Sequence, residues 1–385
     1  MPHFLAKDLF LQTPFSEDGY EFLYQARSLR KPNESLICIS YGKHIFFLRE
    51  VERKKDILIK AEKNTKPNPT GILKGALRVL AKRACVISHN LNEDSSKQTN
   101  QSDFLLKPSQ IMSMELNDFC IEIGFGSGRH LLKMAQENPD QKYIGVEIHT
   151  PSIEQILRQV QLLDLKNIFV VCMDARILLE ILPSNRCQAI YIHFPIPWNK
   201  KPHRRVIVPA LMNEAMRVLK KDSMLHFRTD DEVYFKDVFE SILSEKNVRI
   251  EVAKNLSNTI VSKYEARWQR QQKNIFDLKV FCLKEDKEQK IEYDFNFDFF
   301  DIKESICESQ KIVRQDYFLH ICDVFKTQDK VILSVSFGNF NQPVNKMVIF
   351  DKKNQEAFYF GEKPLATCAN VMAHQELLKL LAEDK

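Results

Sequence analysis

The chain has 385 residues, enough for about two or three domains, and its 44% hydrophobic content is that of a globular protein with a buried core. Lys and Arg number 56 against 51 Asp and Glu, and the net charge of +5 is too small to indicate a nucleic-acid partner by itself. The nine cysteines show no Cys-x-x-Cys pair, and no histidine cluster accompanies them, which argues against a disulfide framework or a metal site. The sequence shows no recognisable secretory signal and no apolar run of the ~18–20 residues that a membrane span needs. We therefore expect a cytoplasmic protein without a membrane segment.

Residues 1–105 are expected to form a small β-rich N-terminal extension. Apolar runs at 36–48 and 57–60 predict a hairpin and a further strand, and a helix is expected over 72–83. That helix carries an apolar stripe and a cationic stripe, namely Leu73, Leu77 and Leu80, and Lys74, Arg78 and Lys82. The cationic stripe fits either an ordinary solvated helix face or a contact with RNA.

Residues 106–285 alternate between strand-like and helix-like runs, after a polar stretch at 93–103 that reads as a linker. Strands are expected at 119–123, 143–148, 168–172, 189–194, 224–227, 248–252 and 275–283, and helices at 128–136, 153–163, 209–219 and 232–243. Such alternation predicts an α/β domain, a Rossmann-like, doubly wound sheet that is covered by helices on both faces.

Residues 286–385 are expected to form a C-terminal α+β extension, which begins beyond the charge-rich stretch at 283–289. Strands are expected at 317–325, 331–337, 347–350 and 357–360, followed by a helix over 368–382. Residues 293–299 alternate aromatic and polar side chains, which indicates a half-buried strand more than a base-stacking surface, because the acidic face would repel phosphates.

A glycine-rich turn follows the first strand of the α/β domain. It reads Glu122-Ile-Gly124-Phe-Gly126-Ser-Gly128, and glycines allow the backbone to approach a ligand closely. Arg129 stands where a dinucleotide fingerprint has its third glycine, which disfavours a pyrophosphate ligand. The acidic residue before the glycines suits a ligand with an amine.

Two further carboxylates follow the next two strands. Glu147 could accept both hydroxyls of a ribose, and Asp174 could accept a hydrogen bond from the amine of an adenine. Open α/β sheets bind their ligands at this edge. S-adenosylmethionine has an aminoacyl end, a ribose and an adenine, and therefore offers one partner to each acidic residue.

A rigid loop with a basic tail follows the fourth strand. Phe194-Pro195-Ile196-Pro197-Trp198 holds two prolines and a Trp that can pack against a base, and cations occupy Lys200, Lys201, His203, Arg204 and Arg205. Cations at this edge could contact phosphates. Further polar motifs are Arg228-Thr229-Asp230 after the fifth strand, and 262–267 before the last strand.

At these motifs the sequence resembles the bacterial tRNA (guanine-N7)-methyltransferase family, whose pattern is E-x-G-x-G-x-G, F-P-D-P-W-x-K, T-D and T-x-[FY]-E. The match covers residues 119–283 in the same order and spacing. The resemblance implies a seven-stranded class I methyltransferase fold that transfers a methyl group from S-adenosylmethionine to a guanine in the variable loop of tRNA.

The resemblance also implies roles for individual residues. Cofactor-binding residues would be Glu122, Gly124, Gly126, Gly128, Glu147, Asp174 and Pro195. Substrate-binding residues would be Trp198, Lys200, Arg204, Arg205, Asp230, Ser262, Lys263, Tyr264 and Glu265, with Asp230 and Lys200 as the catalytic pair. We expect no metal, and a monomer or a weak homo-oligomer.

The sequence departs from the family pattern at Ile196, which replaces the Asp between the two prolines, and at Ser262, which replaces a Thr. The first change removes a carboxylate from the expected catalytic loop. N7 of guanine has a lone pair and no proton, so its attack on a methyl group needs no general base, and positioning can supply the catalysis. Two alternatives stay open: a methyltransferase of another base nitrogen in RNA, and a catalytically inactive RNA-binding partner protein.

Overall fold

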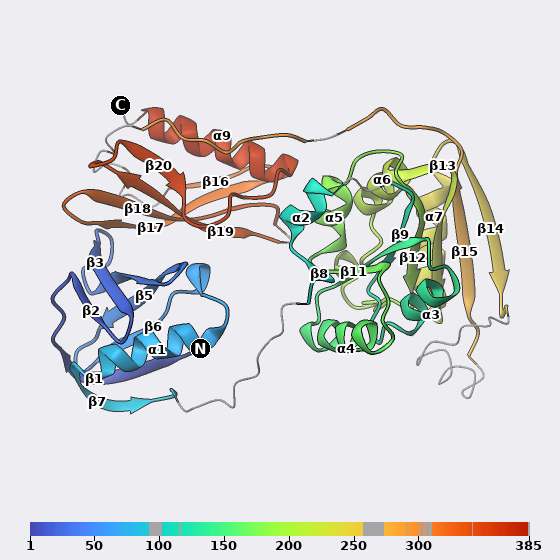
Figure 1. Cartoon of the computed structure of the whole chain (residues 1–385). Coiled ribbons are helices and arrows are strands. Elements are labelled where there is room, and N and C mark those ends of the chain that lie inside the picture. Colours follow the sequence, from blue (N-terminus) through green and yellow to red (C-terminus); the bar gives the residue numbers. More distant parts are fainter. Residues whose placement is uncertain are drawn as a thin grey trace. The chain divides into compact units, whose positions relative to one another are not determined.

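The computed structural model describes residues 1–91, 102–114, 117–256, 273–289, 291–299, 310–340 and 342–383, and the single residues 302 and 306. The chain divides into two compact units (Figure 1). Unit 1 combines Met1–Asn100 with Tyr293–Lys385, and unit 2 is the continuous segment Gln101–Glu292. The sequence places domain boundaries near residues 105 and 285, and the expected linker at 93–103 lies outside the described residues except for its last two.

Unit 2 contains the expected doubly wound sheet. Its strands are β8 (Leu105–Leu106), β9 (Phe119–Ile123), β10 (Lys142–Glu147), β11 (Ile168–Cys172), β12 (Cys187–His193), β13 (Leu219–Thr229), β14 (Val248–Lys254) and β15 (Phe276–Cys282). They lie in the order β14-β15-β13-β12-β9-β10-β11-β8. All pairs are parallel except those of β15, which runs antiparallel to β13 and β14. The seven predicted strands are therefore confirmed, and the two-residue β8 extends the sheet at one edge.

Helices connect most of the successive strands of this sheet along the chain. They are α2 (Pro108–Ser113), α3 (Arg129–Glu137), α4 (Thr150–Leu162), α5 (Ala175–Ile181), α6 (Pro209–Val218) and α7 (Glu232–Leu243), with the short 3-10 helix η2 (Pro202–Arg204). All five residues of β9 are buried, so both faces of the central strand are covered. Helix α5 is only seven residues long and was not predicted from the sequence.

Unit 1 is built on a second, antiparallel sheet. The N-terminal residues supply β1 (His3–Leu9), β2 (Phe15–Glu17), β3 (Tyr20–Ser28), β4 (Glu34–Tyr41), β5 (His44–Glu52), β6 (Ile57–Ala61) and β7 (Ala84–His89), with η1 (Lys63–Thr65) and α1 (Thr70–Ala81). The C-terminal residues supply β16 (Lys311–Val313), β17 (Phe318–Lys326), β18 (Lys330–Gly338), β19 (Val344–Asp351) and β20 (Glu356–Tyr359), with α9 (Cys368–Glu383). The main path is β20-β19-β18-β17-β3-β4-β5-β6-β1-β7, and β2 and β16 pair with β3 and β17.

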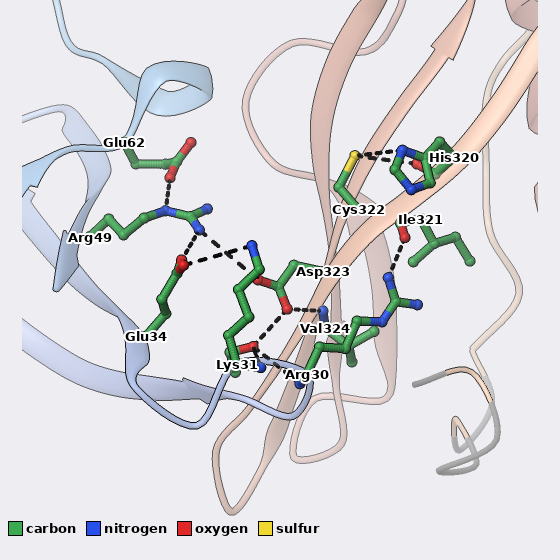
Figure 2. A network of polar contacts seen from close by, with 11 residues as sticks. Arg30, Lys31, Glu34, Arg49, Glu62, His320, Ile321, Cys322, Asp323 and Val324 are labelled. Carbon is green, nitrogen blue, oxygen red and sulfur yellow. Dashed lines mark hydrogen bonds and ion pairs between the residues drawn. The ribbon is translucent and has the colours of Figure 1, made fainter. Parts of the chain in front are cut away.

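The two ends of the chain meet where β3 pairs with β17, a feature that the sequence did not indicate. Figure 2 shows the polar network beside this seam, in which Arg49 contacts Glu34 at 2.6 Å and Glu62 at 2.7 Å. In addition, Ser28 Oγ donates to Asp323 Oδ1 at 2.7 Å. One apolar cluster also contains side chains from both ends, namely Ala26, Leu36, Cys38, Phe47, Phe325, Ile332, Met347 and Ile349. The N- and C-terminal extensions therefore share a core.

Residues 293–299 alternate in burial as expected, but the prediction of a strand was wrong, because this segment pairs with no strand in the described part of the chain. Its aromatic rings instead approach α9, with the centroids of Phe295 and Phe297 at 5.3 and 4.8 Å from His374. The His374 ring lies between the Tyr359 hydroxyl at 2.9 Å and the Asn296 carbonyl at 3.2 Å. A neutral imidazole satisfies both, since one nitrogen accepts and the other donates.

The charged stretch at 283–289 belongs to unit 2. Ser184 Oγ donates to the Lys287 carbonyl at 2.9 Å, and the Asp286 amide donates to Asn185 Oδ1 at 3.0 Å. These bonds attach the segment to the loop before β12 and explain why unit 2 extends to Glu292.

Candidate cofactor and substrate site

The predicted site residues that the structure describes lie at one edge of the unit 2 sheet. Strands β11, β10, β9, β12 and β13 are parallel neighbours, so the loops that follow them meet at the same edge. The chain crosses in opposite directions from the adjacent strands β9 and β12, which makes their junction the topological switch point. The glycine turn follows β9 and the Pro/Trp loop follows β12, on the two sides of that point.

The glycine turn has three residues in the left-handed region, with φ of 70° at Gly124, 52° at Gly126 and 71° at Gly128. A Cβ at Gly124 would meet nothing within 4 Å, and one at Gly126 only a backbone oxygen at 4.0 Å. The backbone here has open space beside it, as a bound ligand requires. Gly128 differs, because a Cβ there would lie 2.5 Å from Ile156 Cδ1. Gly128 therefore allows α3 to pack closely on α4, and it does not border open space as Gly124 and Gly126 do.

The Glu147 carboxylate at the end of β10 is held by the backbone. Its Oε2 accepts from the Gly126 amide at 3.2 Å, and its Oε1 accepts from the amides of Ile148 and His149 at 2.8 and 3.0 Å. The carboxylate is thereby tied to the glycine turn. Its remaining lone pairs suit the two adjacent hydroxyls of a ribose.

The Asp174 carboxylate caps α5 and pairs with Arg176. It accepts from the Arg176 amide and Nε at 2.9 Å each, and from Nη2 at 2.5 Å. Burial raises the pKa of Asp174, but the hydrogen bonds from Arg176 outweigh it and hold that pKa below its ordinary value. Asp174 is therefore a fixed anion that can still accept one more donor.

Glu122 is only 4% exposed, and its Oε2 lies 3.1 Å from His130 Nδ1 in the first turn of α3. The ring of His130 lies 4.5 Å from that of His193, at the end of β12. Glu122, His130 and His193 bring one potential ligand atom each within 4.8 Å of one another, a donor set that suits a transition-metal ion. No metal was expected from the sequence, and neither histidine was predicted as a site residue, although His193 directly precedes the Pro/Trp loop.

The Pro/Trp loop is strained and partly exposed. Phe194 and Trp198 have φ of 50° and 45°, which is rare for residues other than glycine. Trp198 is 38% exposed and Ile196 is 64% exposed, so the loop presents apolar surface at the sheet edge. The Arg204 guanidinium lies 5.4 Å from the Trp198 ring. An exposed Trp198 ring beside the Arg204 guanidinium could stack against a planar base.

Arg205 is placed differently from the role expected for it. It is only 4% exposed, and it donates to the Pro197 carbonyl at 2.6 Å and to Asn199 Oδ1 at 2.9 Å. It also pairs with Asp237 of α7, and lies 4.6 Å from the Tyr234 ring. A guanidinium with these partners braces the loop and is not available to a phosphate. The expectation of a substrate contact at Arg205 is corrected accordingly.

Comparison with known proteins identifies the family to which the sequence is similar. A family model described as a putative methyltransferase matches residues 117–278. The tRNA (guanine-N(7)-)-methyltransferase of Helicobacter hepaticus is 44% identical over the full length of both chains. The proteins of the same name from Helicobacter pylori and Wolinella succinogenes are 40% and 39% identical, over 99–100% of each chain.

The chain belongs to the tRNA (guanine-N(7)-)-methyltransferase family. The family model covers the predicted motifs in unit 2, and the similarity to the three relatives extends through both units.

The other expected substrate contacts of this family member that the structure describes lie on or near the Pro/Trp loop. Lys200 and Arg204 are exposed, so both side chains are accessible, and their contact with phosphates stays a prediction. Asp230, which follows β13, has a 19% exposed side chain whose Oδ2 lies 3.1 Å from Lys273 Nζ. The predicted contacts at Ser262, Lys263, Tyr264 and Glu265 lie outside the described residues.

The basic stripe of α1 is engaged within unit 1. Lys82 pairs with Asp18 at 2.7 Å and Glu17 at 3.3 Å, and Arg78 donates to the Leu91 carbonyl at 2.8 Å. The apolar stripe is fully buried as predicted. RNA contact at this helix stays a prediction, and Lys82 and Arg78 already have protein partners. Among the described residues, no helix is both long and apolar enough to cross a membrane.

Proposed function

We propose that this protein transfers a methyl group from S-adenosylmethionine to N7 of a guanine in the variable loop of tRNA, in the cytoplasm. The observation that carries the proposal is the sheet edge itself, where an open glycine turn and fixed carboxylates adjoin an exposed Trp and a cationic loop. Family membership supports the same reaction.

The residues of the glycine turn fit the cofactor. Gly124 and Gly126 leave room for its aminoacyl end, Glu122 receives the ammonium group, and Glu147 receives the ribose hydroxyls. Asp174 accepts from the adenine amine, and Pro195 lines the site beside the methyl group. When bound, S-adenosylmethionine supplies an electrophilic methyl group on a sulfonium.

The Pro/Trp loop receives the tRNA. Lys200 and Arg204 attract phosphates, Trp198 packs against a base, and Asp230 accepts from the amine edge of the guanine, with Ser262–Glu265 as the remaining expected contacts. Arg205 keeps this surface in shape from the inside.

Positioning carries the catalysis in this proposal. N7 attacks through its lone pair and releases no proton, so the carboxylate that Ile196 replaces is not needed as a base. The exposed Ile196 instead adds apolar surface that displaces water from the target base.

Incubation of the full chain with labelled S-adenosylmethionine and unmodified tRNA, followed by nucleoside analysis, tests the proposal. The expected product is 7-methylguanosine. A labelled nucleoside methylated at another nitrogen would favour the alternative enzyme. Binding of tRNA and cofactor without any label would favour an inactive RNA-binding protein, to which the change at Ile196 already points.

A further inference from the structure

A row of polar side chains crosses the unit 2 sheet just below its ligand-binding edge. Residues of β12, β13 and β15 stand side by side, since His193 pairs with Arg228 and Arg228 pairs with Asp277. Glu122 lies on the adjacent β9, and His130 lies above the sheet on α3. The proposed reaction uses only Glu122 of this row, so the other members need a separate explanation.

The row forms a continuous chain of contacts from the cofactor site inward. His130 Nδ1 lies 3.1 Å from Glu122 Oε2, and its ring meets that of His193 edge-on, with centroids 4.5 Å apart. His193 Nε2 lies 3.4 Å from His226 Nδ1, and His226 Nε2 lies 3.0 Å from Asp277 Oδ1. Asp277 accepts only, so His226 Nε2 carries a proton, and His226 Nδ1 accepts from His193 in the neutral ring.

At the inner end of this row of contacts, the charged side chains Arg228 and Asp277 neutralise each other. Burial lowers the pKa of His193 well below its ordinary value, and burial also outweighs the Asp277 hydrogen bond in lowering the pKa of His226. Both rings are therefore neutral at neutral pH. Arg228 Nε lies 2.7 Å from Asp277 Oδ1, and the two charges compensate each other.

The outer end is different. Glu122 is a buried carboxylate, and within the described residues its ion-pair partner is the His130 imidazole, not a lysine or an arginine. A buried carboxylate is unfavourable unless a matching cation and hydrogen bonds satisfy it. His130 can supply one hydrogen bond through Nδ1–H, and the open space at Gly124 lies within the same turn. This arrangement is complete only with a cationic group from a ligand.

We propose that His130 is a positioning residue, whose Nδ1–H holds the Glu122 carboxylate ready for the ammonium group of S-adenosylmethionine, while His193, His226 and Asp277 hold the His130 ring. The inference rests on the proposed function for the identity of the cofactor and extends it to residues outside the family motifs. A metal ion on the same donors is the competing interpretation.

The test compares two ligands, one with and one without the aminoacyl end that carries the ammonium group. S-adenosylhomocysteine carries the aminoacyl end, whereas 5′-methylthioadenosine carries the same adenine and ribose without it. Calorimetric titration of the full chain and of the variant His130→Ala should show about a tenfold loss of affinity for S-adenosylhomocysteine, the size of one charge-assisted hydrogen bond. The affinity for methylthioadenosine should change little. His130→Asn, whose side-chain amide can still donate to Glu122, should recover most of the loss.

Equal losses for both ligands, or an unchanged affinity for S-adenosylhomocysteine, would overturn the inference, as would failure of His130→Asn to recover affinity. Zinc retained stoichiometrically by the wild type and lost by His130→Ala would replace it with a metal centre. These titrations contain no tRNA. A His130-dependent affinity in a protein that methylates no tRNA would therefore refute the proposed function and leave the positioning role standing, whereas a wild type that binds neither ligand would refute both.

Discussion

Replacement of Arg205 by methionine should distort the Pro/Trp loop from within. Methionine keeps apolar volume against the Tyr234 ring but leaves the Pro197 carbonyl and the Asn199 side-chain oxygen without their buried donor. The loss of a buried hydrogen-bond partner costs about 1–3 kcal/mol. The Asp237 partner is half exposed, and its ion pair adds under ~1 kcal/mol. We therefore expect unit 2 to lose roughly 1–4 kcal/mol of unfolding free energy.

For a unit of this size, that loss corresponds to a decrease in Tm of roughly 2–16 °C, which differential scanning calorimetry resolves. The matched control is Arg204→Met, because Arg204 is the exposed neighbour of Arg205 on the same loop. Arg204→Met should leave Tm unchanged and reduce the slope of log affinity for tRNA against log salt by about 0.7–0.9, the value for one phosphate. Arg205→Met should leave that slope unchanged. A normal Tm together with a reduced slope for Arg205→Met would refute the bracing role and restore the phosphate contact.

Three further predictions concern the rest of the chain. Burial lowers the pKa of His374 to about 4 from its ordinary 6.5, so the folded state disfavours protonation of this ring. The contribution of His374 to the stability of unit 1 should therefore be complete above pH 6.5 and decline as the pH falls toward 4, and urea titrations of His374→Gln should show a smaller decline than the wild type. Gly128→Ala should lower the Tm of unit 2, because this residue has a positive φ and its Cβ would clash with Ile156, and Ile156→Val should restore part of the loss. Gly124→Ala has a similar φ but lies in open space, so it should lower Tm less than Gly128→Ala and weaken S-adenosylhomocysteine binding more. The opposite ranking of the two variants in scanning and titration calorimetry would contradict the assigned roles. Deletion of residues 1–105 should produce a protein that aggregates, because the deletion exposes the edge of β17 and removes Ser28, the hydrogen-bond donor to Asp323. A truncated protein that is monodisperse in size-exclusion chromatography and unfolds cooperatively in calorimetry would show that the shared sheet is dispensable.

The local features of unit 2 could be predicted from the sequence. Strand 168–172 and helix 232–243 were found with the bounds that the structure has, because apolar periodicity marks them and Asp231 caps the helix. The site edge followed from the same alternation, since carboxylates after successive parallel strands must meet.

The features that the sequence missed depend on distant partners. Arg205 looks like its cationic neighbours in the sequence, and only Asp237, 32 residues later, shows that it is buried. His130, His193 and His226 are isolated residues that become one chain through strand pairing and the packing of α3. The pairing of β3 with β17 joins opposite ends of the chain, and no local pattern indicates it.

Transfer to tRNA that contains 7-deazaguanine tests the central claim most directly, because this base keeps every edge of guanine except the N7 lone pair. Two transcripts of the same sequence, one with guanine and one with 7-deazaguanine, would be incubated with the full chain and labelled S-adenosylmethionine. The account predicts that both transcripts bind with similar affinity and that only the guanine transcript acquires label, as 7-methylguanosine. Comparable labelling of the 7-deazaguanine transcript would contradict it, because the methyl group would then go to another atom.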